Sequence, residues 1–498
     1  MQITRKLAIV KSIHVAPVRF SFKRLLSNTP YLSPWTARDL INGTPTHRSY
    51  SPRSINNAAA AEGTTQPELS SKQASSKVPI LIAGKKAEFL AVLLRDACSC
   101  PLCVHESTKQ RLFSTADIPA GIQSQAVEID PASDSVNIGW KNDIPGFPEE
   151  HTTTLSMAAL RQLSCSGSLP GQQRDSFRPP ALWGQEPPNL VDYDYNTYMQ
   201  NDGTLHQIIN QLEAEGLAFV TNVPGKEESL ASIATRIGPV KDTFYGYTWD
   251  GRAMSNDLGF HTDLLYFEQP LHIQLLHCVQ SASSGGASVF ADAFKAAVDF
   301  FHMDVDAFNT LATVPVNYHY NHPHSNMYRT TKPVIDLRPL GIGHTIYTGI
   351  QDYIKDWHEL SMRNGGSGWT VAMLVDCMDK INWRPPFLAP FSIHEVPRQQ
   401  EQLADPALSA LKNKVDRWHQ AASKFSGPLQ HPECLYERKM RPGECVLFSN
   451  TRILHSRRAF DMAEIGKPRW LRGTYADKDP YFSKLRVLQH KFKYLRAD

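Results

Sequence analysis

The chain has 498 residues, 41% hydrophobic content and a formal net charge of +3. A chain of this length can bury a substantial core and is too long for one simple domain. The small net charge excludes any need for a polyanionic partner, and no apolar run is long enough to cross a bilayer. We therefore expect a soluble protein that binds neither nucleic acid nor membrane and acts on a small molecule.

The N-terminal segment has the composition of a mitochondrial targeting peptide. Before Asp39 the chain has seven Lys or Arg residues and no acidic residue, interleaved with Leu, Ile, Val and Phe. These charges interrupt the apolar stretches, which is unlike a secretory signal; a basic tail without a targeting role is the alternative. Residues 41–76 are rich in Ser, Thr, Ala, Gln and Pro. We predict a targeting peptide over 1–40, a disordered linker over 41–76 and a location in the mitochondrial matrix.

Three closely spaced cysteines mark the next segment, which we interpret as a small N-terminal domain over 77–160. Cys98, Cys100 and Cys103 lie within six positions. Three thiolates so spaced can surround one tetrahedral ion, with zinc as the natural occupant and a histidine as fourth ligand. His105 is the nearby candidate. Reduced cysteines without metal are the alternative, whereas a disulfide framework is disfavoured because eight cysteines are sparse in this chain.

The remaining chain predicts a linker and then a catalytic domain over 191–498. Residues 161–190 contain a Pro-, Gly- and Gln-rich stretch typical of a linker. Hydrophobic spacing beyond it predicts both helices and strands. The expected strands within 77–498 are 78–82, 135–140, 217–223 and 273–278, and the expected helices are 203–215, 292–311 and 405–425.

His261-Thr262-Asp263 is the first part of a second candidate metal site. In an extended segment, residues two apart point to the same side, so His261 and Asp263 can converge while Thr262 faces away. Two other His-x-acid triplets occur. His302-Met-Asp304 lies in a helical pattern that separates its ends, and His431-Pro-Glu433 lies in a polar, proline-containing loop.

His455 is the candidate for the third ligand of this site. A Pro-Gly turn and a short apolar strand, within 441–450, precede it and can deliver it from another part of a sheet. Two imidazoles and one carboxylate on one face of Fe(II) leave three coordination positions open. Arg469 follows in a basic run, and its planar guanidinium suits a carboxylate such as the far end of a 2-oxoacid.

Several motifs together resemble a known family, the Fe(II)- and 2-oxoglutarate-dependent dioxygenases of the gamma-butyrobetaine hydroxylase and trimethyllysine hydroxylase group. They occur in the family's order from about residue 190 to the C-terminus. The matching stretches are 244–249 (FYGYTW), 260–270 (FHTDLLYFEQP), 274–278 (QLLHC), 454–458 (LHSRR) and 473–477 (GTYAD).

The resemblance implies a mainly β catalytic domain with flanking helices, a double-stranded β-helix or jelly roll whose metal site lies inside one open end. His261, Asp263 and His455 match the family's iron ligands. Arg469 matches the residue that anchors 2-oxoglutarate, and a one-residue offset leaves Arg472 as a second candidate. The N-terminal segment resembles the small zinc-binding β domain of the same enzymes, in which the fourth ligand follows an acidic pair, here His151.

The activity implied by the resemblance is hydroxylation of a small trimethylammonium compound or related amine, as in carnitine biosynthesis. Oxidative decarboxylation of 2-oxoglutarate would drive it, with ascorbate as the expected reductant and a homodimer as the expected assembly. Tyr245, Trp249 and Tyr475 match positions of an aromatic cage, which can hold a quaternary ammonium by cation–π attraction. Each of these aromatic residues, taken alone, is as well explained by packing.

One departure from the family leaves the substrate open. The segment 250–260 is shorter than in the carnitine-pathway enzymes, so one cage wall and part of the grip on the substrate carboxylate are missing or rebuilt. The loop 347–350 also lacks a matching Asn. The alternatives to a gamma-butyrobetaine hydroxylase-like enzyme are a dioxygenase with a diverged pocket for another small molecule and a non-catalytic binding protein of the same fold.

Overall fold

The computed structural model describes residues 76–166, 179–184, 187–251, 258–342, 345–363, 365–384, 405–459 and 469–494. The predicted targeting peptide and all but the last residue of the predicted linker over 41–76 lie outside these residues. One compact unit includes residues 88–126 and 138–152, and the other includes 80–87, 127–137 and 153–498. Within the described residues, no helix combines the length and the apolar character needed to span a membrane.

The N-terminal elements are short and mostly β. They form a two-stranded sheet, β1-β2, and a three-stranded sheet, β3-β4-β5. Exposed and buried residues alternate along β1, as expected for a sheet with one buried face. The elements are β1 (Lys77–Ile82), β2 (Lys85–Leu90), α1 (Ala91–Asp96), η1 (Thr115–Asp117), β3 (Gln123–Asp130), β4 (Ser135–Lys141), β5 (Thr152–Ser156) and α2 (Met157–Ser166).

The part of the chain from β6 onward begins with three helices interleaved with its first strands and continues through alternating strands and helices to α11. Its elements are β6 (Asp192–Asp194), α3 (Tyr195–Gln200), α4 (Asp202–Glu215), β7 (Leu217–Thr221), α5 (Ser229–Ile237), β8 (Trp249–Gly251), β9 (Leu258–His261), β10 (Ile273–Gln280), β11 (Ser288–Asp292), α6 (Ala293–Met303), α7 (Val305–Thr313), β12 (Val316–His322), β13 (Asn326–Lys332), β14 (Ile335–Leu337), β15 (Leu340–Ile342), β16 (Thr345–Tyr347), α8 (Ile350–Arg363), α9 (Val371–Cys377), β17 (Met378–Ile381), α10 (Asp405–Gln430), η3 (Pro432–Cys434), β18 (Leu435–Arg438), β19 (Cys445–Ser449), β20 (Ile453–Arg457), β21 (Trp470–Ala476) and α11 (Lys478–Tyr494).

Two sheets form the centre of the catalytic part. The larger has six strands in the order β6-β7-β19-β10-β21-β8, and the smaller has four in the order β18-β11-β20-β9. Most neighbours are antiparallel and distant in sequence, which is typical of a jelly roll. The expected mainly β architecture with flanking helices is therefore present.

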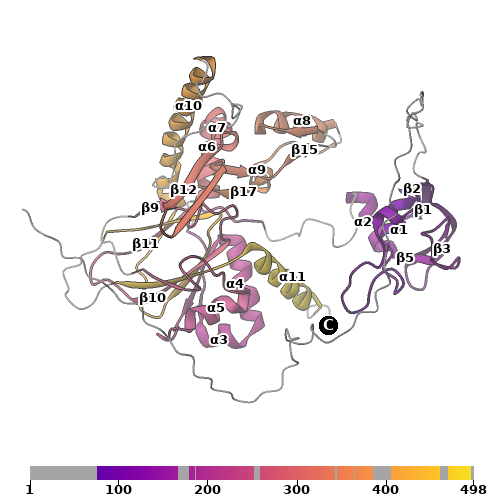
Figure 1. The fold of residues 1–498 in the computed structure, drawn as a ribbon, viewed down its shortest axis with the longest axis horizontal. Coiled ribbons are helices and arrows are strands. Elements are labelled where there is room, and N and C mark those ends of the chain that lie inside the picture. Colours follow the sequence, from indigo (N-terminus) through magenta and orange to yellow (C-terminus); the bar gives the residue numbers. More distant parts are fainter. Residues whose placement is uncertain are drawn as a thin grey trace, which may run out of the picture. The chain divides into compact units, whose positions relative to one another are not determined.

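Helices cover both outer sides of these sheets (Figure 1). Apolar residues of α4, α5 and α11 form one core with β7, β10 and β19. Residues of α6, α7, α9 and α10 form another core beside β11 and β20. At the end of α4, Gly216 has a φ of +73°, and a Cβ there would lie 2.7 Å from the Ile453 side chain. Only glycine therefore fits this turn, which leads directly into β7.

The predicted elements differ from the structure mainly at their ends. The helix expected over 292–311 is two helices, α6 and α7, because Asp304 adopts an extended conformation and its carboxylate accepts a hydrogen bond from the amide of Ala307. Helix α2 continues to Ser166, inside the predicted linker over 161–190. At the other end of that linker, Trp183 is buried, and its indole donates to the Glu215 carbonyl at 3.0 Å.

Candidate active site

Strand pairing brings two of the predicted iron ligands together. His261 is the last residue of β9 and lies directly opposite His455 of the antiparallel neighbour β20. Their ring centroids are 4.1 Å apart. Asp263 follows two residues after His261, and its Oδ1 atom lies 3.4 Å from His261 Nε2. One donor atom from each of the three residues lies within 4.8 Å of the others.

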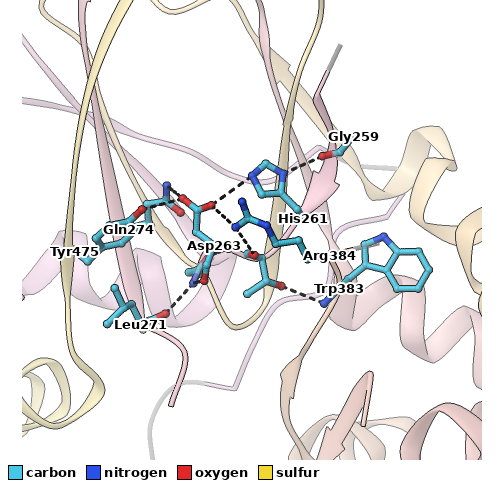
Figure 2. Close-up of polar contacts among 10 residues, drawn as sticks. Gly259, His261, Asp263, Leu271, Gln274, Trp383, Arg384 and Tyr475 are labelled. Atoms are coloured by element: carbon cyan, nitrogen blue, oxygen red, sulfur yellow. Dashed lines mark hydrogen bonds and ion pairs between the residues drawn. The ribbon is translucent and has the colours of Figure 1, made fainter. Parts of the chain in front are cut away.

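Asp263 is buried and held by three side chains from different elements (Figure 2). Its Oδ2 accepts hydrogen bonds from Gln274 Nε2 at 2.7 Å and from the Tyr475 hydroxyl at 3.0 Å. Arg384 Nη1 donates to Oδ1 at 2.9 Å. Burial opposes ionisation, but nearby positive charge, including that of the Arg384 guanidinium, holds the pKa of the Asp263 carboxyl well below its usual range. This carboxylate is therefore charged at neutral pH and available to a cation.

The backbone around Asp263 is fixed by a buried amide. Asn450 Oδ1 accepts from the Asp263 amide at 2.9 Å, and Asn450 Nδ2 donates to the carbonyls of Asp263 and Leu271 at 3.1 and 2.9 Å. The next residue, Leu264, has a φ of +51°. Leucine rarely adopts this left-handed conformation, which costs about 1–2 kcal/mol. The surrounding contacts thus hold a strained turn immediately after the carboxylate.

The two imidazoles have the properties that a metal ligand needs. His261 Nδ1 lies 2.9 Å from the Gly259 carbonyl and donates to it, which leaves Nε2 as the acceptor nitrogen that faces Asp263. Burial lowers the pKa of His455 to about 3, so its ring is neutral at pH 7. Two imidazoles and one carboxylate on one face fit Fe(II) with open coordination positions.

A cavity of about 600 Å³ adjoins these donors, and both sheets contribute to its wall. Strand β21 shows which of the two candidate arginines faces it. Side chains alternate along a strand, so Arg469, Leu471 and Tyr475 point to one side and Arg472 to the other. Among the described residues, the first three line the cavity and Arg472 does not. Arg472 instead pairs with Asp250 at 3.1 Å.

The predicted cage residues Tyr245, Trp249 and Tyr475 all line this cavity. The rings of Trp249 and Tyr475 are nearly parallel, at 27°, with centroids 6.4 Å apart. Gly473 lies opposite Trp249 on the neighbouring strand, and a Cβ there would lie 2.2 Å from the indole. Glycine at this position therefore lets the Trp249 ring lie flat against the sheet. Residues 252–257, in the shortened segment, lie outside the described residues.

The N-terminal cysteines form a second group of metal-ligating atoms. His151 Nε2 lies 3.6 Å from Cys98 Sγ, 3.5 Å from Cys100 Sγ and 3.4 Å from Cys103 Sγ. His105 is exposed and is not part of the group; its Nδ1 accepts from the Thr108 amide at 3.3 Å. Three sulfurs and one nitrogen around a single point are the donor set of a structural zinc site.

Buried charged residues surround this cysteine group. Asp143 Oδ2 lies 2.7 Å from His151 Nδ1, which orients the ring so that Nε2 faces the sulfurs. Arg95 is fully buried, pairs with Asp143 and donates to Cys103 Sγ at 3.4 Å. Burial raises the pKa of the Cys103 thiol to about 12. This thiol therefore keeps its proton at neutral pH until a cation displaces it.

Four residues that contact Asp263 or line the cavity were not predicted from the sequence. Gln274 lies in the matched stretch 274–278 and Asn450 ends the turn-and-strand segment 441–450, but nothing in the spacing shows that they reach Asp263. Tyr266 lies in the same motif as His261 and lines the cavity. Arg384 precedes two prolines between β17 and α10, and no pattern in the sequence points to it.

Two family models match successive parts of the chain. The family model of the taurine catabolism dioxygenase TauD, TfdA family matches residues 175–475. The model of the gamma-butyrobetaine hydroxylase-like N-terminal domain matches residues 70–145. Among solved structures, a putative alpha-ketoglutarate-dependent taurine dioxygenase from Burkholderia xenovorans has a TM-score of 0.37 and 13% identity, covering 61% of this chain and 93% of that one.

Curated relatives match most of the chain. Dioxygenase str8 of Strobilurus tenacellus is 29% identical over 425 residues, which cover 80% of this chain and 84% of the relative. Gamma-butyrobetaine dioxygenase of Pseudomonas sp. (strain AK-1) is 27% identical, covering 82% and 92%. Mitochondrial trimethyllysine dioxygenase of Homo sapiens is 24% identical, covering 82% and 84%. The chain belongs to the TauD/TfdA family and is an Fe(II)- and 2-oxoglutarate-dependent dioxygenase of the gamma-butyrobetaine and trimethyllysine hydroxylase group.

Proposed function

We propose that this enzyme hydroxylates a small trimethylammonium compound or a related amine. The observation that carries the proposal is an aromatic wall beside the group of His261, Asp263 and His455, in one cavity. A quaternary ammonium has no N–H to donate, so aromatic faces and apolar contact must hold it. The relatives named gamma-butyrobetaine dioxygenase and trimethyllysine dioxygenase support the same class of substrate.

In this proposal the three donors hold Fe(II), and Arg469 pairs with the far carboxylate of 2-oxoglutarate. When bound, the iron and this co-substrate would supply the oxidation that converts a C–H bond into C–OH. The protein binds and orients the co-substrate and the substrate and shields them from solvent. Arg469 is suited to its role because it is buried on the cavity wall, and although burial lowers its pKa to about 10, it stays positively charged at neutral pH.

The aromatic wall would enclose the ammonium group from several sides. Tyr245, Trp249 and Tyr475 form three parts of it, and we assign the fourth to Tyr266. Tyr266 lies within hydrogen-bonding reach of Tyr245, and burial raises the pKa of its phenol above its usual range, so the ring stays neutral. This residue compensates for the wall that the shortened segment 250–260 does not provide.

The remaining features complete the proposal. Zinc held by Cys98, Cys100, Cys103 and His151 would stabilise the N-terminal domain, because its four protein donors leave no position for a substrate. The basic N-terminus and the mitochondrial relatives support import into the matrix. A fluorescent protein fused to residues 1–40 tests the import, and light scattering after size exclusion tests the expected homodimer.

The deciding experiment measures succinate release from 2-oxoglutarate with Fe(II), ascorbate and a panel of quaternary amines that includes gamma-butyrobetaine and trimethyllysine. We expect at least one amine to raise succinate release together with its own hydroxylation. Trp249→Ala should raise KM about tenfold and change kcat less, because a cation–π contact of about 1–2 kcal/mol is lost. Unstimulated turnover with the whole panel would reject this substrate class and leave the dioxygenase assignment in place.

A further inference from the structure

We propose that Arg384 is the specificity residue of this cavity and receives the carboxylate of a zwitterionic substrate whose ammonium end faces the aromatic wall. This inference rests on the proposed function, since it assigns the second end of the same substrate. The observation behind it is that the Arg384 guanidinium, from a segment outside the two central sheets, lines the cavity and donates a hydrogen bond to the Asp263 carboxylate.

Arg384 lies just after β17, in a segment that packs across the end of β9. The Trp383 carbonyl accepts from the Thr262 amide at 2.7 Å, and the Ile381 carbonyl accepts from the Thr262 hydroxyl at 3.0 Å. These bonds place Arg384 beside Asp263, as Figure 2 shows, with its guanidinium carbon 6.0 Å from the centroid of the Tyr266 ring. The backbone thus delivers a positive charge to the cavity wall.

The charge of Arg384 is balanced in this structure by Asp263. Once Fe(II) takes Asp263, the carboxylate shares its charge with the cation and no longer compensates the guanidinium fully. The Arg384 side chain is only 14% exposed, so water compensates the charge poorly. A carboxylate in the cavity that Arg384 lines would restore this compensation.

The co-substrate already has its own arginine. Arg469 directly precedes β21 and lines the cavity. Arg384 instead follows β17, and its guanidinium carbon lies 6.0 Å from the centroid of the Tyr266 ring. The cavity is therefore lined by two arginines from different parts of the chain, and we assign one anion to each, 2-oxoglutarate to Arg469 and a second acid to Arg384.

A guanidinium beside the aromatic wall also excludes simple cations. A trimethylammonium group without an acid would be repelled by Arg384 at short range, whereas a carboxylate on the same molecule turns this repulsion into an ion pair. The aromatic wall and Arg384 together therefore select a molecule with a positive and a negative end. Part of the carboxylate grip that segment 250–260 cannot supply would in this way come from a different part of the chain.

Calorimetry on the full chain tests this with Mn(II) in place of Fe(II) and with 2-oxoglutarate bound. The probes are gamma-butyrobetaine, butyltrimethylammonium, which lacks the acid, and 5,5-dimethylhexanoate, which replaces the charged nitrogen by carbon. We expect gamma-butyrobetaine to bind about 10- to 100-fold more tightly than butyltrimethylammonium, the range of a charge-assisted contact. Arg384→Gln should bring this ratio close to one, and Arg384→Lys should lower it several-fold, because a point charge replaces the planar fork.

Two controls separate the roles. Arg458→Gln removes a positive charge that pairs with Glu437 outside the cavity lining and should leave the ratio unchanged. Mn(II) affinity is measured in each variant. An unchanged ratio in Arg384→Lys or Arg384→Gln, with or without weaker Mn(II) binding, would make Arg384 a positioning residue of Asp263 and overturn the proposal.

The probes also distinguish this inference from the proposed function. If butyltrimethylammonium binds as tightly as gamma-butyrobetaine to the unmodified protein, the amine assignment survives and the role of Arg384 is refuted. If only 5,5-dimethylhexanoate and similar acids bind, and do so through Arg384, the acid receptor is supported and the trimethylammonium assignment fails.

Discussion

The two candidate metal sites of this chain differ in how many protein atoms surround the ion. The N-terminal group has four donors, Cys98, Cys100, Cys103 and His151, whereas the group in the jelly roll has three, His261, Asp263 and His455. Four protein donors complete a tetrahedron, so an ion held by them is part of the fold. Three donors on one face leave positions for other molecules, and the adjoining cavity gives those molecules room.

The residues that support the donors also differ between the two groups. Near the cysteines, Asp143 and Arg95 pair with each other and with the ligands His151 and Cys103, which leaves the charged groups internally balanced. Around Asp263, the donors Gln274, Tyr475 and Arg384 come from separate elements, and all but Gln274 line the cavity. The first arrangement resists change, while the second places ligand-supporting residues within reach of a substrate.

The largest loss of activity should follow from removing a donor of the three-donor site formed by His261, Asp263 and His455. Asp263→Ala leaves two imidazoles, and we expect succinate release to fall about 1000-fold or more, because the bound metal supplies several kcal/mol to the reaction. Iron content should fall with it. Asp304→Ala is the matched control, since it removes the acid of another His-x-Asp triplet, at the junction of two helices. Equal activity of Asp263→Ala and the unmodified enzyme would reject the iron site.

Removing a donor of the four-donor cysteine site should lower the stability of the N-terminal domain and not the rate of the reaction. Cys100→Ser is expected to release zinc and destabilise the N-terminal domain by about 2–4 kcal/mol, which lowers the Tm of a domain of this size by about 10–25 °C. Metal analysis and calorimetry measure both. Cys434→Ser, at a buried cysteine outside the group, should keep the zinc. Stoichiometric zinc in the Cys100→Ser variant would contradict the assignment of Cys100 as a zinc ligand.

Substituting Asp143, which pairs with His151, should weaken zinc binding less than substituting one of the four zinc donors. Asp143→Asn removes the charge that orients the imidazole and should weaken zinc binding about 10- to 100-fold, as measured by competition with a chelator. Asp96→Asn removes one charge from an ion pair with Arg111 in the same domain and serves as the control. Similar zinc affinities of the two variants would show that Asp143 has no special role.

The ease of predicting each site from sequence reflects how its donors are arranged. The cysteines lie within six positions, so their spacing alone pointed to a metal. The pair His261 and Asp263 was recognisable as a triplet, and the structure brings His455 to it through the register of β20 against β9. Strand alternation also places Arg469 on the cavity side and Arg472 on the other, a choice that the motif alignment left open.

Other features required the fold itself. Arg384 reaches Asp263 from a segment more than a hundred positions away, and no local spacing encodes such a contact. Asn450 forms its bonds to Asp263 and Leu271 only once β19 lies beside β10. The break between α6 and α7 depends on Asp304 as a helix cap, which an apolar pattern continuing across 292–311 concealed.

The smallest expected effect separates two roles of one residue. Tyr475 lines the cavity and also donates to Asp263 Oδ2, which accepts from Gln274 as well. Tyr475→Phe keeps the ring and removes the hydroxyl, and since Gln274 still supports the carboxylate, we expect iron affinity to fall only about fivefold. Binding of a quaternary amine should be unchanged, because the face of the ring remains. Tyr198→Phe, at a buried tyrosine that donates to the Ile233 carbonyl, controls for the loss of a hydroxyl. A variant that binds iron normally but loses the amine would place the hydroxyl on the substrate, and Tyr475 would then belong to the recognition wall alone.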